Sequence, residues 1–153
     1  MRFIAHRGNT NGVNIEKENT IEQIILAIEK NFDVEIDVWY KNKSFYLGHD
    51  NSEHIISLDF LLHFSKFFWC HAKNIETLNE LLKYSKINCF FHQNDDCTLT
   101  SHQYIWSHIN FNKSLTERSI LLKFAKDKKF TIPENIFGMC SDNVEYYKNK
   151  INE

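Results

Sequence analysis

Short apolar runs alternate along the chain with segments in which apolar residues recur at the spacing of a helix. The clearest helical segment has one apolar face, made of Ile21, Ile24, Ile25 and Ile28. Thr20 and Gln23 have the spacing of a capping box, so the sequence predicts that this helix starts after Thr20. Further helices are predicted over 58–64 after Ser57, over 75–82 after Asn74, and after Ser141 or Asp142.

Apolar runs too short for helices predict strands between these segments. They cover residues 3–5, 34–39, 44–47, 67–72, 87–91, 104–106, 119–123 and 136–140. The turn-like residues 41–43 suggest that 34–39 and 44–47 form a hairpin. The segment 93–135 lacks long helical patterns. Alternation of strands and helices indicates a largely parallel α/β arrangement.

Composition limits the classes of protein to consider. The chain has 153 residues, 42% hydrophobic and 25% charged, which predicts one globular domain over 1–153. The net charge of −2 gives no reason to expect nucleic acid as a partner. The sequence contains no run of about 20 apolar residues, so no membrane span is predicted. The start, MRFIAHRG, has no signal-peptide pattern, so a cytoplasmic protein with reduced thiols is expected. The four cysteines form no CxxC pair, which argues against a structural zinc site.

Polar residues end several of the predicted strands. His6 and Arg7 follow the first strand, and Glu35 and Asp37 lie two apart on the second. The series continues with His71 and Lys73, then His92, and then the segments near 106–108, 123 and 141–142. Because the carboxyl ends of parallel strands meet at one edge, we expect these side chains to converge there.

The acidic pair predicts a metal site. Side chains alternate along a strand, so Glu35 and Asp37 point to the same side while Val34, Ile36 and Val38 fill the other. Two adjacent carboxylates repel each other unless a positive charge lies between them, and Mg²⁺ or Ca²⁺ suits such oxygen ligands. Histidines nearby can supply an acid and a base near neutral pH. Arg7 suggests an anionic substrate.

Four strings in order resemble one known family. His6-Arg7-Gly8, Glu18-Asn19-Thr20, Glu35-x-Asp37 and Gly48-His49-Asp50 have the order and rough spacing found in the glycerophosphodiester phosphodiesterases. These belong to a superfamily with the phosphatidylinositol-specific phospholipases C. The resemblance is strong over about residues 3–50 and thin beyond 75. It implies a TIM-type (β/α) barrel, here shortened and with several helices reduced or missing, because such barrels usually need about 200 residues or more.

The resemblance also implies roles for individual residues. His6 and His49 would be the catalytic acid and base, and Glu35 and Asp37 would bind one divalent cation. Arg7 would hold a phosphate oxygen, although it could equally pair with Glu18. Its place after a predicted strand, and not the resemblance, puts His92 with the substrate-binding residues, although a loop histidine beside Asp95 and Asp96 could instead be exposed. Trp106 could line the pocket or belong to the core. His54, His63, His102 and His108 carry no motif and are assigned to the surface or to structure.

The chain departs from the family pattern on one strand. The common family string there is Glu-x-Lys, whereas this chain has His71-Ala72-Lys73. Lys73 would neutralise the phosphate. His71 could be a third metal ligand, shifting the preference towards Mn²⁺, Co²⁺ or Zn²⁺, or it could leave that position to water.

The expected function is therefore metal-dependent cleavage of a small glycerophosphodiester-like substrate, by water or by the substrate's own hydroxyl. Two alternatives remain open. The first is an enzyme acting on nucleotide- or polysaccharide-linked glycerol phosphate in envelope biosynthesis. The second is a non-catalytic barrel that binds a phosphorylated ligand.

Overall fold

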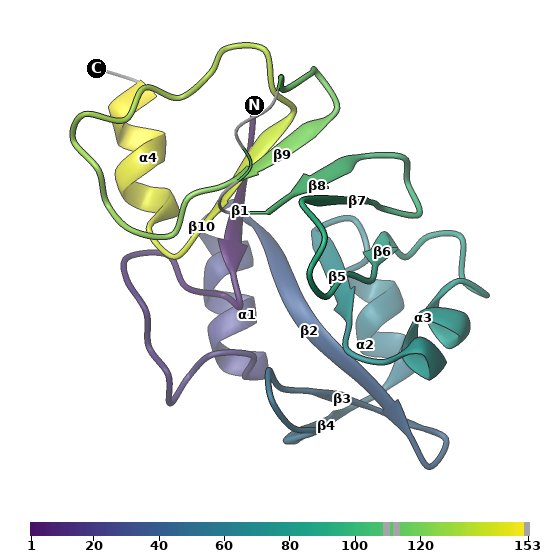
Figure 1. Cartoon of the computed structure of the whole chain (residues 1–153). Coiled ribbons are helices and arrows are strands. Elements are labelled where there is room, and N and C mark those ends of the chain that lie inside the picture. The colour runs from purple at the N-terminus through teal and green to yellow at the C-terminus, as the bar shows by residue number, and fades with distance from the viewer. Residues whose placement is uncertain (109–110, 112–113, 152–153) are drawn as a thin grey trace.

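A computed structural model describes residues 1–108, 111 and 114–151 of the chain (Figure 1). Its strands are β1 (Arg2–His6), β2 (Asp33–Lys41), β3 (Ser44–Leu47), β4 (His54–Ile56), β5 (Phe68–Ala72), β6 (Cys89–Phe90), β7 (Cys97–Leu99), β8 (Ile105–Ser107), β9 (Ser119–Leu122) and β10 (Gly138–Ser141). Its helices are α1 (Ile21–Glu29), α2 (Leu58–His63), α3 (Ile75–Leu81) and α4 (Val144–Ile151).

The strands form one curled sheet of 10 strands with mixed directions. Its parallel part has the spatial order β6-β5-β2-β1-β10-β9-β8, with β1 at the centre. Strand β3 pairs antiparallel with the carboxyl-terminal part of β2, and β4 pairs antiparallel with β3. Strand β7 is antiparallel to β8. The carboxyl ends of the parallel strands therefore lie together along one edge of the sheet.

The predicted shortened TIM-type barrel is wrong. Across the described residues the structure is a half-barrel with 4 helices and 20% helix. There, β6 pairs with β5 and β7 with β8, so the sheet remains open between β6 and β7. The physical reason lies in the segment after β6, where the chain forms β7, which is antiparallel to β8. Within the described residues, no parallel strand therefore pairs with the free edge of β6.

Each of the first three helices begins at a residue that caps it. The side chains of Thr20, Ser57 and Asn74 accept hydrogen bonds from backbone N–H groups three residues further on. Helix α1 packs on β2, α3 packs on β2, β5 and β6, and α4 packs on β1 and β10. Within the described ranges, no helix has the length and apolar character that crossing a bilayer requires.

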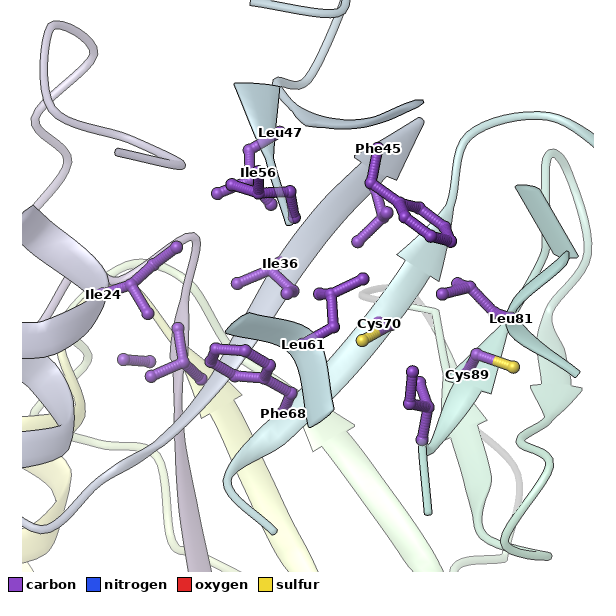
Figure 2. Packing of buried hydrophobic residues seen from close by; sticks show 14 of the residues in the cluster. Ile24, Ile36, Phe45, Leu47, Ile56, Leu61, Phe68, Cys70, Leu81 and Cys89 are labelled. Atoms are coloured by element: carbon purple, nitrogen blue, oxygen red, sulfur yellow. The ribbon is translucent and has the colours of Figure 1, made fainter. Parts of the chain in front are cut away.

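The two faces of the sheet carry separate apolar clusters. The larger one lies between the sheet and the helices, where Figure 2 shows Leu61 of α2 and Phe68 beside Ile36 of β2. The smaller one fills the concave face and consists of Ile4, Trp69, Phe90, Trp106, Ile120, Leu122 and Cys140. Because strand side chains alternate, the same concave face receives Glu35, Asp37 and His71 nearer the strand ends.

Candidate active site

A cavity of about 410 Å³ opens at the carboxyl ends of the parallel strands. Every residue that the sequence predicts for the site lines it: His6, Arg7, Glu35, Asp37, His49, His71, Lys73 and His92. These residues come from β1, β2, β5 and the segments that follow β1, β3, β5 and β6. The convergence expected from strand ends therefore occurs, although the sheet is only a half-barrel.

Strand register places the key side chains next to one another. His6 at the end of β1 lies opposite Glu35 on β2, and Asp37 lies opposite His71 on β5. Neighbouring strands are about 4.8 Å apart, so residues paired in register on one face have side chains in reach of each other. This register explains why three short strings distant in the sequence form one cluster.

Asp37 lies at the centre of this cluster, with positive groups on both of its oxygens. Arg7 Nε lies 3.1 Å from Oδ2, and Lys73 Nζ lies 3.1 Å from Oδ1. His71 Nδ1 lies 3.0 Å from Oδ1. Burial disfavours the charged form of Asp37, but the hydrogen bond with His71 and the charges of Lys73 and Arg7 prevail and lower its pKa well below the usual range. Asp37 is therefore ionised at neutral pH.

Asn19 fixes the orientation of Asp37. Its side-chain amide donates to Asp37 Oδ2 at 3.0 Å, and its Oδ1 accepts the backbone N–H of Asp37 at 3.0 Å. Asn19 is buried and has a positive φ of 57°. Asparagine tolerates this left-handed conformation better than most residues, which explains why an asparagine occupies the middle of the string Glu18-Asn19-Thr20.

Glu35 has a different electrostatic environment, although it is two residues from Asp37. Its side chain is 3% exposed, and its carboxylate accepts the backbone N–H of Arg7 at 3.2 Å. The imidazoles of His6 and His71 lie farther away, each at 3.9 Å. Burial, followed by the negative charge of Asp37, raises the pKa of Glu35. A bound cation would therefore stabilise the charged form of Glu35 more than that of Asp37, which already has positive groups beside it.

Arg7 turns away from β1 in a left-handed conformation, with φ of 53°. Its Nη1 binds Glu18 at 2.9 Å while its Nε faces Asp37. The pairing with Glu18 and the position in the cavity therefore occur together. Gly8 follows with φ of 83°, in close contact with Gln23 of α1, where a side chain would be strained.

A buried carboxylate orients His6. The Nδ1–H of His6 donates to Asp142 Oδ1 at 2.8 Å, and Asn9 donates to the same oxygen at 2.8 Å. The ring of Phe124 stacks on His6 with centroids 4.4 Å apart. Burial opposes protonation of His6, but the hydrogen bond with Asp142 and the charge of Glu35 outweigh it and raise its pKa. The Nε2 atom is left on the side of Glu35.

His49 lies in the connection between β3 and β4, on another side of the cavity. Its side chain is 43% exposed, and its Nδ1 lies 2.7 Å from Asp50. The preceding Gly48 donates its N–H to Asp37 O at 3.2 Å and accepts the Trp39 indole N–H at 2.7 Å, so this connection is attached to β2. Burial and the nearby cations Arg7 and Lys73 lower the pKa of His49, against the attraction of Asp37.

A cluster of nearly parallel rings supports His71, in which Phe90 and His92 both contact His71 and lie 6.1 Å from each other. Trp106 stacks on Phe90, Phe90 stacks on His71, and His71 stacks on His92. The planes of His71 and Phe90 are 4° apart, so the imidazole has a defined orientation towards Asp37. Burial, together with His71, His108 and Lys73, lowers the pKa of His92 to about 4, and its imidazole is therefore neutral at pH 7.

Glu35, Asp37 and His71 form a group that could hold a metal ion. Each offers one ligand atom, and these atoms lie within 4.8 Å of one another. Ligands on opposite sides of one Ca²⁺ ion are about 5 Å apart and those of Mg²⁺ about 4 Å, so the spacing fits a divalent cation. The donor set of two carboxylates and one imidazole also suits Mn²⁺. Lys73 and the His71 Nδ1–H now occupy Asp37 Oδ1, so a cation would have to displace one of them.

Several residues of the site were not predicted from the sequence. Asp142 was interpreted as a possible helix cap, Asn9 was not singled out, and Phe124 carries no motif. His108 was assigned to the surface or to structure but lines the cavity near His92. Asp142 directly follows β10 and belongs to the series of strand ends expected from the sequence, but its contact with His6 was not predicted.

The comparisons with known proteins add no relative. The chain matches no model of a known protein family, no curated protein and no solved structure.

Proposed function

We propose that the protein is a divalent-cation-dependent phosphodiesterase that cleaves small glycerophosphodiester-like substrates. One observation carries this proposal: the potential cation ligands Glu35, Asp37 and His71 share one cavity with two cationic side chains and with histidines on separate sides. The resemblance of residues 3–50 to the glycerophosphodiester phosphodiesterases agrees with it.

Arg7 and Lys73 would bind the phosphate. Both lie within 3.1 Å of Asp37, which sets their positions, and both line the cavity. A phosphodiester carries one negative charge, and more develops on its oxygens in the transition state. Cations held in place by Asp37 need no reorganisation to stabilise that charge.

His6 and His49 differ in a way that favours separate roles. The pKa of His6 is raised through Asp142, which makes His6 the better proton donor to a leaving alcohol. The pKa of His49 is lowered, which keeps its imidazole neutral and able to accept a proton from the attacking hydroxyl. Each ring has a carboxylate at Nδ1, so each can present Nε2 to the substrate.

Glu35, Asp37 and His71 would hold the cation, which when bound supplies Lewis-acid polarisation of a phosphoryl oxygen. The raised pKa of Glu35 shows that the protein itself under-compensates this carboxylate. A histidine binds a cation through a ring nitrogen that carries no proton, so His71 would have to give up its Nδ1 hydrogen bond with Asp37 to bind through that atom.

Phosphorus NMR tests the proposal directly. Glycerophosphodiesters and bis-p-nitrophenyl phosphate are incubated with the protein and Mg²⁺, Mn²⁺ or Ca²⁺, or with EDTA. We expect cation-dependent loss of the diester signal, with a phosphomonoester or a cyclic phosphate as product. The variant His6→Ala should lose activity by about 10²–10⁴-fold.

The control is His54→Ala, which removes a histidine outside the cavity that is more exposed than His6 and should retain wild-type turnover. Turnover that is equal in EDTA, or equal in His6→Ala and wild type, would contradict the proposal. Binding of a diester without turnover under any of these conditions would favour the non-catalytic alternative.

A further inference from the structure

A second cavity of about 330 Å³ lies at the opposite ends of the parallel strands. Arg2 begins β1, Asp33 begins β2 and Phe68 begins β5, and all three line it. The candidate active site uses the other ends of the same strands, so the two cavities are separated by the sheet's inner apolar cluster.

The lining of this second cavity has an excess of positive charge. Asp33 is its carboxylate, and it is already bound by Arg2 at 3.2 Å and by the Trp69 indole N–H at 3.1 Å. Lys66 and Lys86 also line the cavity, and both are exposed. Within the described lining residues, no second carboxylate balances these two ammonium groups. A negatively charged ligand would supply the missing compensation.

Aromatic rings form another part of the lining. Trp69, Tyr104 and Phe137 lie in mutual contact, with centroids 4.2 Å apart for Tyr104 and Phe137 and 5.2 Å apart for Trp69 and Tyr104. Tyr104 and Phe137 are half-buried, and the guanidinium of Arg118 lies 5.7 Å from the centre of the Tyr104 ring, so a ligand would contact the remaining exposed part of each ring. Rings that are held at fixed angles by one another are suited to stack on a flat ligand group.

We propose that this cavity binds a small anion that carries a planar ring, of the nucleotide type. The two lysines and Arg2 account for an anionic group, and Tyr104 with Phe137 accounts for the ring. An inorganic anion would leave the aromatic part of the lining unused, and a neutral aromatic compound would leave the lysines uncompensated. The volume is within the range of small-molecule sites, about 300–1,000 Å³. This inference does not depend on the proposed phosphodiesterase activity.

Calorimetric titration with AMP, ribose 5-phosphate and adenosine tests the inference. AMP should bind most tightly, because it alone combines the ring with the phosphate. Its affinity should fall as salt is raised, because exposed cations are screened. No detectable AMP binding, or equal affinity for AMP and ribose 5-phosphate, would overturn the proposal.

Variants assign the binding to this cavity. Tyr104→Leu should weaken AMP binding by roughly fivefold or more, the usual effect of removing a stacking ring, while Tyr104→Phe should retain it. Lys66→Ala with Lys86→Ala should weaken it about tenfold. The control Lys17→Ala with Lys128→Ala removes the same charge from exposed positions outside the cavity and should change nothing.

The first cavity also holds cations, so binding there must be distinguished. Arg7→Ala should leave AMP affinity unchanged if the second cavity is the site. If Arg7→Ala abolishes binding while Tyr104→Leu retains it, the nucleotide occupies the candidate active site and this inference is wrong. Turnover on phosphodiesters plays no part in either outcome, so failure here leaves the proposed function untouched.

Discussion

At the scale of single residues, the charge balance of the cavity depends on Asp37. Three positive or potentially positive groups contact its carboxylate, and Asn19 holds it in place. Glu35, on the same face of the same strand, has one backbone N–H donor at 3.2 Å and no cation nearer than 3.9 Å among its described contacts. The charged carboxylate of Asp37 is therefore expected to increase the free energy of unfolding, whereas that of Glu35 is expected to decrease it.

Replacing each acid by its amide tests this difference. Asp37→Asn leaves the nearby cations uncompensated and should lower the free energy of unfolding by about 3 kcal/mol at pH 7 without divalent cations. Glu35→Gln removes a buried charge. The free energy of unfolding should therefore fall by less than about 1 kcal/mol, or rise. Urea denaturation measures both, and similar losses in the two variants would contradict the account.

The pH dependence of these variants follows from the directions of the two pKa shifts. The lowered pKa of Asp37 gives stability that is present above about pH 3.9 and is lost as the pH falls through its pKa in the folded state. Wild type should therefore lose its advantage over Asp37→Asn in acid. The raised pKa of Glu35 has the opposite effect, so wild type should lose stability relative to Glu35→Gln as the pH rises above about 4.3.

Asp142 should control the protonation of His6. In Asp142→Asn the hydrogen-bonded charge is gone and burial prevails, so the pKa of His6 should fall. In wild type the stabilisation from this pair is complete below about pH 6.5 and lost as the pH rises through the raised pKa of His6. NMR titration of the His6 ring measures the shift. Asp50→Asn, beside His49, is the control, and an unchanged His6 pKa in Asp142→Asn would contradict this assignment.

His71 offers a test of the cation site by gain of charge. His71→Glu places a third carboxylate near Glu35 and Asp37, so affinity for Mg²⁺ or Ca²⁺ should rise. The cation-free variant should melt at a lower temperature than wild type, because three close carboxylates repel one another. Melting curves with and without Mg²⁺ measure both effects. A variant that neither loses stability nor gains affinity would place residue 71 outside the site.

Single residues also show what the sequence could and could not predict about the site. Glu35 and Asp37 could be predicted because strand alternation and an apolar opposite face are visible locally. Asp142 could not be given its role, because its partner His6 is 136 residues away and the pairing depends on β1 and β10 being neighbours. Phe124 and Asn9 depend on the same long-range arrangement.

At the scale of elements, β2 connects the site to the helices. Its face with Glu35 and Asp37 forms the cavity, and Val34, Ile36 and Val38 on its other face are fully buried. The carboxyl-terminal part of β2 is hydrogen-bonded to α3 through Thr77. The hydroxyl of Thr77 accepts the backbone N–H of Tyr40 at 2.6 Å and donates to Asn74, the residue that caps α3.

Thr77→Val removes this connection while preserving shape. Thr77 is fully buried, so the Tyr40 N–H is left without its acceptor. We expect a loss of about 1–3 kcal/mol in the free energy of unfolding. Thr131→Val, at an exposed position, is the matched control and should change it by less than about 0.5 kcal/mol. A loss below that value in Thr77→Val would show that the hydroxyl contributes little.

Most element predictions rest on local signals, and these succeeded where the signal was strong. The caps at Thr20, Ser57 and Asn74 accept the expected backbone hydrogen bonds, and each predicted apolar run overlaps a strand. Strands β4 and β7 were not predicted. Each has three residues, Ile55 and Leu99 in them are exposed, and neither segment shows a clear apolar alternation. Such strands form because a neighbouring strand offers a free edge.

At the scale of the whole molecule, the half-barrel shows why a site can be predicted when the architecture is not. The site depends on three adjacent parallel strands, β1, β2 and β5, and the local sequence specifies them. Closure into a barrel depends on a further parallel strand pairing with the free edge of β6. The segment after β6 instead forms β7, which is antiparallel to β8. The resemblance of residues 3–50 contains no information about that segment.

Cation affinity in paired variants decides whether Glu35, Asp37 and His71 hold a divalent cation. Calorimetric titration of wild type with Mn²⁺ should show one cation per chain, and Glu35→Gln should lower the affinity by about tenfold or more. Glu53→Gln, at an exposed carboxylate outside the cavity, should bind like wild type. If wild type binds no divalent cation, or if Glu35→Gln binds it as tightly as Glu53→Gln does, the cluster of Glu35, Asp37 and His71 is not a cation site and the account is wrong.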